Sequence, residues 1–176
     1  MARTTKLNGK SMTLAGPEIK VGQKAPDFHM VDIDGKEETL SQSQGKIRLL
    51  SVVHSLDTPV CNLQTQRFEQ AAKFPGVVIY TVSMDLPFAQ ARYASANNIQ
   101  NIKILSDHRL ASLGRAYGVL IEDLRLLSRA IFIIDQHDVI RYVEYVPEVS
   151  QAPDYDKALA ALRGIAGVPA AAGSGA

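Results

Sequence analysis

The chain has 176 residues and a single cysteine, Cys61, and the residues just before it favour a reactive thiol. Thr58 is a good N-cap and Pro59 a good first helical residue, because proline fixes φ and its missing N–H is no loss there. This count puts Cys61 at the third helical position, among unpaired backbone N–H groups and at the positive end of the helix dipole. Such a position favours the thiolate, which is the nucleophilic form of cysteine.

A lone cysteine is more often a small buried hydrophobic residue than a functional group. The place of Cys61 in the first turn of a predicted helix, one turn after a threonine cap, makes the reactive thiol the better interpretation. Because the chain has no second cysteine, an intramolecular disulfide is excluded, and the thiol can pair only with another molecule.

Other kinds of chemistry have little support in the sequence. The histidines His29, His54, His108 and His137 show no metal-ligand spacing with Cys61, so a zinc site is not expected. The glycines form neither a dinucleotide fingerprint nor a Walker loop. A cysteine hydrolase would need an oriented histidine and an oxyanion hole, and the sequence places neither. We therefore expect no metal and no cofactor.

Composition predicts one ordinary globular domain. Hydrophobic residues make up 46% of the chain, charged residues 21%, and the formal net charge is +1, which shows no bias toward nucleic acid. No stretch approaches the roughly 20 apolar residues that cross a bilayer. The first residues also lack the apolar core of a signal peptide, so the expected location is the cytoplasm.

Apolar runs and turn residues predict alternating strands and helices. Tight turns are expected at Asn8-Gly9, inside a hairpin over residues 3–15, and at Asp34-Gly35. Strands are predicted at 47–53, 77–83, 102–105, 130–135 and 139–146, helices at 58–74, 87–98, 106–117 and 154–163, and an irregular segment at 121–127.

This order predicts an α/β sandwich with a central mixed sheet, helices on its faces and an N-terminal β-hairpin. Chemistry in such sheets gathers beyond the carboxyl ends of the parallel strands, where the loop before Cys61 lies. Residues 1–163 form the predicted domain, and the Gly- and Ala-rich tail 164–176 is predicted to be disordered. The core face of the Cys61 helix is expected to carry Val60, Leu63, Arg67, Phe68 and Ala71.

Four motifs in register resemble the thiol peroxidase subfamily of the peroxiredoxins: SLDTPVC, DLPFAQARY, LSDHR and SRAIFIID. The segments KLNGKSMTLAG, VGQKAPDF and PDYDKALAAL fit the same pattern, so the resemblance runs from about residue 5 to residue 163. It implies a thioredoxin-like fold, reduction of hydroperoxides in antioxidant defence, a homodimer, and electrons from thioredoxin or another thiol. Cys61 matches the peroxidatic cysteine, Thr58 the motif threonine and Arg129 the active-site arginine.

Several neighbours complete the predicted site. His54, Ser55, Asp57 and Phe88 are expected to line it, with Asp57 accepting hydrogen bonds in the loop before the helix. His54 stands where the family carries a proline that packs the loop and shields the thiolate. It is either a loop substitution packed at the pocket edge, or a group close enough to Cys61 to form an ion pair or to protonate the leaving oxygen.

The family's resolving cysteine is absent, because the matching position holds Ala94. Either the enzyme naturally works with one cysteine, or a cysteine was replaced at this position. In both cases an external thiol must resolve the sulfenic acid, which would otherwise be overoxidised. Two other functions stay open: a thiol–disulfide exchanger on the same fold, and a redox sensor or binding protein that uses Cys61 without turnover.

Overall fold

The computed structural model describes residues 2–167. Its strands are β1 (Arg3–Leu7), β2 (Lys10–Ala15), β3 (His29–Asp32), β4 (Glu37–Thr39), β5 (Ile47–Val52), β6 (Val77–Ser83), β7 (Lys103–Ser106), β8 (Leu120–Ile121), β9 (Leu126–Leu127), β10 (Ala130–Ile134) and β11 (Ile140–Tyr145). Its helices are the short 3-10 helix η1 (Leu40–Ser43) and the α-helices α1 (Pro59–Ala71), α2 (Pro87–Ala96), α3 (Ser112–Ala116) and α4 (Tyr155–Ala166).

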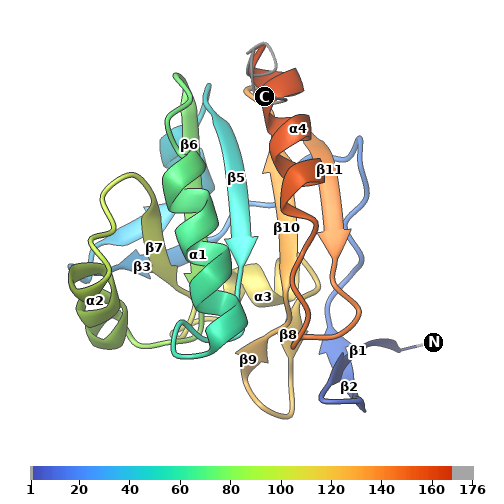
Figure 1. Cartoon of the computed structure of the whole chain (residues 1–176). Helices are drawn as coiled ribbons and strands as arrows, with labels where there is room; N and C mark the ends of the chain where they lie inside the picture. Colours follow the sequence, from blue (N-terminus) through green and yellow to red (C-terminus); the bar gives the residue numbers. More distant parts are fainter. Residues whose placement is uncertain (1, 168–176) are drawn as a thin grey trace, which may run out of the picture.

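Seven strands form the main sheet, in the order β11-β10-β5-β6-β7-β3-β4 (Figure 1). The neighbours β5, β6 and β7 run parallel, as the predicted strand–helix–strand pattern requires. Strand β10 pairs antiparallel with β5 and with the edge strand β11, which confirms the predicted C-terminal hairpin. Every residue of β5 is buried, because helices cover both faces of this central strand.

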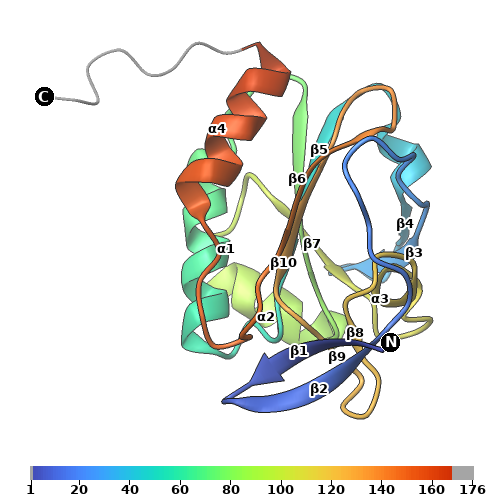
Figure 2. The ribbon, with the colours of Figure 1, turned by 90° about the vertical axis from the view of Figure 1, so that its right-hand side faces the viewer.

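Two helical layers cover the sheet. Figure 2 shows α1, α2 and α4 on one side, with α3 and the segment that follows β2 on the other. The first layer packs through Phe68 of α1 and Leu162 of α4. The second packs through Phe28 and Tyr117, and Tyr117 contacts Phe132 of β10. The observed architecture is the predicted α/β sandwich.

A second, four-stranded sheet has the order β1-β2-β8-β9. The hairpin β1–β2 turns at Asn8 and Gly9, whose φ angles of +51° and +80° match the left-handed turn predicted from these residues. The segment 121–127 was expected to be irregular, and that expectation is wrong, because β8 and β9 form a short hairpin there. Buried Leu120 and Ile121 pair with the end of β2, so tertiary pairing orders a segment too short for a periodic pattern.

The predicted core face of α1 is largely wrong. Leu63 is 53% exposed, whereas the polar Gln64, Thr65 and Glu69 are buried beside Phe68. Each buried polar side chain has partners: for example, Glu69 accepts hydrogen bonds from the backbone N–H groups of residues 100–102. Hydrophobic periodicity misses a helix face whose polar groups are satisfied inside the protein.

Two predicted helix boundaries also differ. The helix expected from residue 106 begins only at Ser112, because Ala111 adopts a left-handed φ of +50° and breaks the turn before it. Asp154 is the N-cap of α4, as expected, and accepts a hydrogen bond from the backbone N–H of Lys157. This helix continues to Ala166, past the domain boundary predicted at residue 163. The rest of the predicted tail, residues 168–176, lies outside the described residues.

The buried carboxylate of Asp107 should make stability depend on pH. It accepts hydrogen bonds from the backbone N–H groups of Leu113 and Gly114, yet burial outweighs these contacts and raises the pKa of Asp107 to about 6. Since the folded-state pKa exceeds the unfolded value, the native state binds the proton more tightly, and stability falls as pH rises from about 4 to about 6.

We expect ionisation of Asp107 to lower the free energy of unfolding by about 3 kcal/mol across this window, the free energy that corresponds to the difference between its folded and unfolded pKa. Asp107→Asn removes this dependence, so urea denaturation at several pH values should give a flatter curve for the variant than for the parent protein. Parallel curves for the two proteins would contradict the assignment.

Candidate active site

Cys61 lies beyond the carboxyl end of β5, at the third residue of α1. Thr58 is the N-cap in an extended conformation and Pro59 the first helical residue, as the sequence predicts. The side chain of Cys61 is fully buried and not disulfide-bonded. The backbone N–H of His54 donates a hydrogen bond to its Sγ at 3.3 Å. The sulfur therefore lies between the amino end of a helix and an N–H donor of the preceding loop.

The loop before α1 is fixed by an aspartate, although not by the one that the sequence suggested. Asp57 is exposed, and Asp85 is the acceptor. The Asp85 carboxylate receives hydrogen bonds from the hydroxyl of Ser55 at 2.8 Å and from the N–H of Leu56 at 2.9 Å. The Thr58 hydroxyl donates to the carbonyl of Ser55 at 2.8 Å, so its oxygen keeps free lone pairs.

Arg129 is buried beside this loop, with 2% of its surface exposed. Its Nε and Nη2 donate to the carbonyl of Val149, at 2.9 and 2.6 Å, and its Nη1 donates to Oε1 of Gln64 at 2.9 Å. The Gln64 amide nitrogen in turn donates to the hydroxyl of Ser51 at 2.7 Å. Gln64 lies one helical turn after Cys61 and links the arginine to α1.

The acceptors around Arg129 are uncharged. No carboxylate of the described residues lies within ion-pair distance of its guanidinium. A buried cation without a counter-ion attracts a negative charge nearby, because the low local dielectric strengthens their interaction. The site thus has one fixed positive charge available for a thiolate or a developing alkoxide.

A pocket of about 180 Å³ opens at this place. Its lining includes side chains from the loop before α1, from α1, from the N-terminal hairpin and from the segments around β10 and β11: Asn8, His54, Thr58, Pro59, Val60, Arg129, Val149 and Ser150. The wall of this pocket is mostly apolar, with Arg129 as its buried charge. Cys61 is fully buried and directly follows the lining residue Val60 in α1.

The rim of the pocket is held by Glu148. Its carboxylate accepts hydrogen bonds from the N–H groups of Asn8 and Gly9, at 2.8 and 2.9 Å, and from the hydroxyl of Ser150 at 3.0 Å. The backbone donors, Gly9 first, lower the pKa of Glu148 to about 2, so the carboxylate stays charged at neutral pH. The N-terminal hairpin is thereby joined to the pocket.

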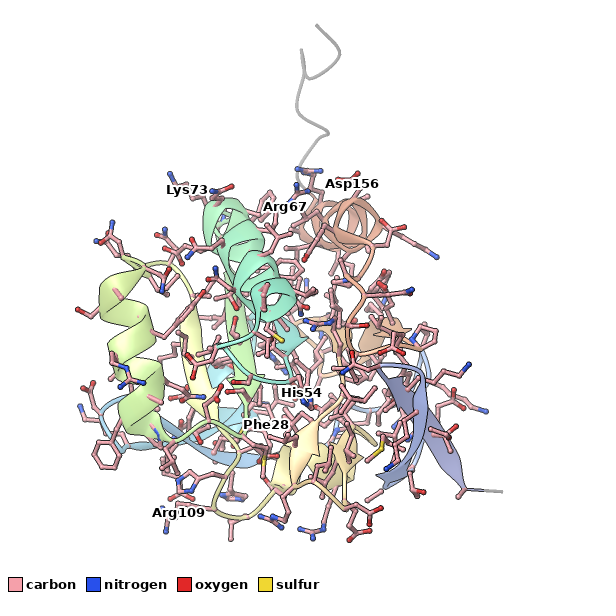
Figure 3. The ribbon with its side chains drawn as sticks, turned by 60° about the horizontal axis from the view of Figure 1, so that its bottom comes forward. Phe28, His54, Arg67, Lys73, Arg109 and Asp156 are labelled. Atoms are coloured by element: carbon pink, nitrogen blue, oxygen red, sulfur yellow. The ribbon has the colours of Figure 1, made fainter. Side chains whose placement is uncertain are left out.

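The structure brings together only part of the predicted lining. His54, which is labelled in Figure 3, lines the pocket. Its ring Nδ1 lies 3.0 Å from the carbonyl of Leu127. Ser55 acts through Asp85 rather than in the pocket, and Asp57 borders a separate groove near Tyr93. Phe88 is 85% exposed and lies outside the pocket lining.

Ala94, which the sequence resemblance assigns to the resolving position, is buried in one apolar cluster with Cys61. The cluster also contains Val53, Leu56 and Ile104. Sequence reasoning missed Gln64, Asp85, Leu127 and Glu148. For Gln64 the signal was its spacing of one turn from Cys61, whereas the other three contacts come from segments distant in the sequence.

Among residues 2–167, no cluster of three potential metal ligands is found, and no helix has the length and apolar character needed to cross a membrane.

Comparisons with known proteins identify the family of the chain. Residues 20–159 match the Redoxin family. A peroxiredoxin-like protein from Aquifex aeolicus has a solved structure that superposes with a TM-score of 0.87 at 41% identity, covering 94% of this chain and 98% of that one. Fold and site define a thioredoxin-like redoxin.

Curated relatives narrow the class. A thiol peroxidase from Halalkalibacterium halodurans is 53% identical over 156 residues, which is 88% of this chain and 94% of that protein. A thiol peroxidase from Bacillus subtilis is 46% identical over 166 residues, 94% of this chain and 99% of that protein. The chain belongs to the thiol peroxidase subfamily of the redoxin family.

The buried Arg129 network predicts a strong effect of a conservative change. Arg129→Lys keeps the charge but loses the planar fork that holds Val149 and Gln64 together. We expect the second-order rate constant for oxidation of Cys61 by hydrogen peroxide to fall about 100-fold, the loss typical of one transition-state donor. Stopped-flow measurement checks this.

The matched control is Arg141→Lys, because Arg141 is half exposed on β11 and pairs with Asp135 away from the pocket. Equal losses in the two variants would show that the effect is one of general stability.

Proposed function

We propose that this thiol peroxidase reduces hydrogen peroxide and organic hydroperoxides through Cys61. The Cys61 thiolate attacks one peroxide oxygen, a sulfur–oxygen bond forms as the O–O bond breaks, and sulfur is oxidised by two electrons to a sulfenic acid. The departing alkoxide takes a proton from solvent and leaves as the alcohol, or as water when the substrate is hydrogen peroxide.

The observation that carries this proposal is the position of the sulfur. Cys61 lies at the amino end of α1, accepts a backbone hydrogen bond and lies next to a pocket that contains a buried guanidinium with neutral acceptors. In this role Arg129 stabilises the negative charge that moves along the O–O bond. Thr58, whose hydroxyl proton is committed to Ser55, offers lone pairs that accept a hydrogen bond from the peroxide.

Turnover requires an external thiol, because the chain has one cysteine and Ala94 stands at the resolving position. A first thiol attacks the Cys61 sulfenic acid, which gives a mixed disulfide and water. A second thiol then releases the Cys61 thiol and leaves with the first as a disulfide. Thioredoxin or another cellular thiol fits this requirement. Without a thiol, further peroxide converts the sulfenic acid to sulfinic acid.

The comparisons with thiol peroxidases do not favour the two rival functions, an exchanger or a sensor without turnover. A cytoplasmic location stays a prediction of the sequence alone.

Oxidation of the reduced protein tests the function directly. Stopped-flow mixing with hydrogen peroxide or cumene hydroperoxide, with intact mass at each time point, should show rapid addition of one oxygen per chain. The addition should be absent in Cys61→Ser, and excess thiol should sustain consumption of peroxide by the parent protein. Oxidation no faster than that of an ordinary exposed thiol would reject the peroxidase.

We also propose a homodimer, as the family resemblance implies. Leu86 and Phe88, at the start of α2, are 53% and 85% exposed, and burying them against a second copy would remove apolar surface from water. Light scattering should give twice the chain mass of 19.1 kDa for the parent protein.

Phe88→Ser should weaken this dimer, whereas Val21→Ser, an exposed apolar position in the segment between β2 and β3, should not. A monomeric parent protein, or equal behaviour of the two variants, would contradict the α2 interface.

A further inference from the structure

We propose that the backbone N–H of His54 is a catalytic hydrogen-bond donor to the Cys61 thiolate, and that the imidazole ring serves to hold it in place. The proposal deepens the peroxidase function and rests on it. It also assigns a purpose to the residue that stands where the family carries proline, because proline has no N–H to give.

The hydrogen bond has a defined geometry. The N–H of Val53 pairs with the carbonyl of Val82 at 2.9 Å and so continues the pairing of β5 with β6. The next N–H, that of His54, points to Sγ of Cys61 at 3.3 Å. Val53 and Cys61 are fully buried and His54 is half-buried, so this donor is partly shielded from water. A hydrogen bond to a thiolate is charge-assisted and stronger than one to the neutral thiol.

The ring is tethered on its other side. A carbonyl oxygen only accepts hydrogen bonds, so the contact with Leu127 requires His54 Nδ1 to carry the proton and to donate it. Leu127 belongs to β9, which pairs with β8, and β8 pairs with β2 of the N-terminal hairpin. The second sheet therefore holds the ring, and through the ring it orients the backbone N–H toward sulfur.

Among the polar groups near Cys61, the backbone N–H of His54 is a fixed hydrogen-bond donor that does not depend on pH. Tyr93 of α2 and Tyr155 of α4 interact electrostatically with Cys61, and burial raises the pKa of both phenols, so both are neutral at neutral pH. Asp85 is committed to Ser55 and Leu56. Arg129 is always charged. A backbone N–H likewise does not titrate, unlike an imidazolium that paired with the thiolate.

Three substitutions separate the backbone from the ring. His54→Pro removes the N–H and the ring, His54→Ala keeps the N–H and loses the ring, and His54→Asn keeps the N–H and an amide able to donate to Leu127. The readout is the rate of alkylation of Cys61 by iodoacetamide against pH, which reports the thiolate without needing peroxidase activity.

We expect His54→Pro to move the midpoint of this pH profile upward by about one pH unit, the effect of losing one charge-assisted hydrogen bond. His54→Asn should match the parent protein, and His54→Ala should move the midpoint by less than half as much as the proline variant. At a pH below the midpoints of both proteins, the rate of oxidation by hydrogen peroxide should fall about tenfold in His54→Pro, as the same loss of thiolate implies.

An alanine variant whose midpoint moves as far as that of the proline variant would overturn the proposal, because the ring would then be the active group. Three unchanged profiles would overturn it as well. Failure of the peroxidase function shows separately, as slow oxygen addition to a parent protein whose alkylation profile is nonetheless sensitive to His54→Pro.

The unsubstituted protein offers a second measurement in case the proline variant does not fold. The backbone amide proton of His54 should move downfield in a proton–nitrogen correlation spectrum as the Cys61 thiol ionises. Its chemical shift should return to the value of the neutral thiol state when the sulfur is alkylated. An amide signal that stays unchanged through this titration would reject the hydrogen bond.

Discussion

The site depends on the buried guanidinium of Arg129. Placing a charged group where 2% of its surface meets water is unfavourable unless its donors are used, and here two distant segments supply the acceptors. The arginine directly precedes β10, the segment after β11 offers the carbonyl of Val149, and α1 offers the amide of Gln64. Because both acceptors are neutral, the charge is held in position without being cancelled, and it can act on an anion in the pocket.

The need to hold the Arg129 guanidinium in place explains contacts that lie far from the sulfur. The N–H of Val149 donates to the carbonyl of Lys6 in β1, and Glu148 holds the hairpin turn at Asn8 and Gly9. The N-terminal hairpin thus fixes the carbonyl that orients Arg129, while β9 fixes the ring of His54. The small sheet looks peripheral in Figure 1, yet both of its ends contribute contacts to the site.

Local chemistry allowed the sequence to predict the position of Cys61. Thr58 and Pro59 mark the start of a helix by rules that involve only a few neighbouring residues, and the predicted third helical position is the observed one. The alternation of β5, α1 and β6 could be predicted for the same reason. The burial of Gln64 and Glu69 could not be predicted, because a polar residue on a helix is buried only when its partner comes from elsewhere in the chain. Asp85 took the role expected of Asp57 because the carboxylate that fixes the loop comes from the end of the neighbouring strand β6.

The packing that buries Cys61 also hinders the external thiol that must reduce it after oxidation. Cys61 and Ala94 share one apolar cluster, and a disulfide across it would demand that two Cα atoms come within about 7 Å with their side chains facing. With alanine at this position, α2 carries no sulfur that has to reach Cys61. An external thiol must then reach a sulfur that is fully buried, next to a pocket that is lined by Thr58, Pro59 and Val60. Movement of this first turn of α1 would break the contact between His54 and sulfur while Gln64, one turn further on, still holds Arg129. The contact of His54 with the sulfur and the contact of Gln64 with Arg129 are therefore made at successive turns of α1.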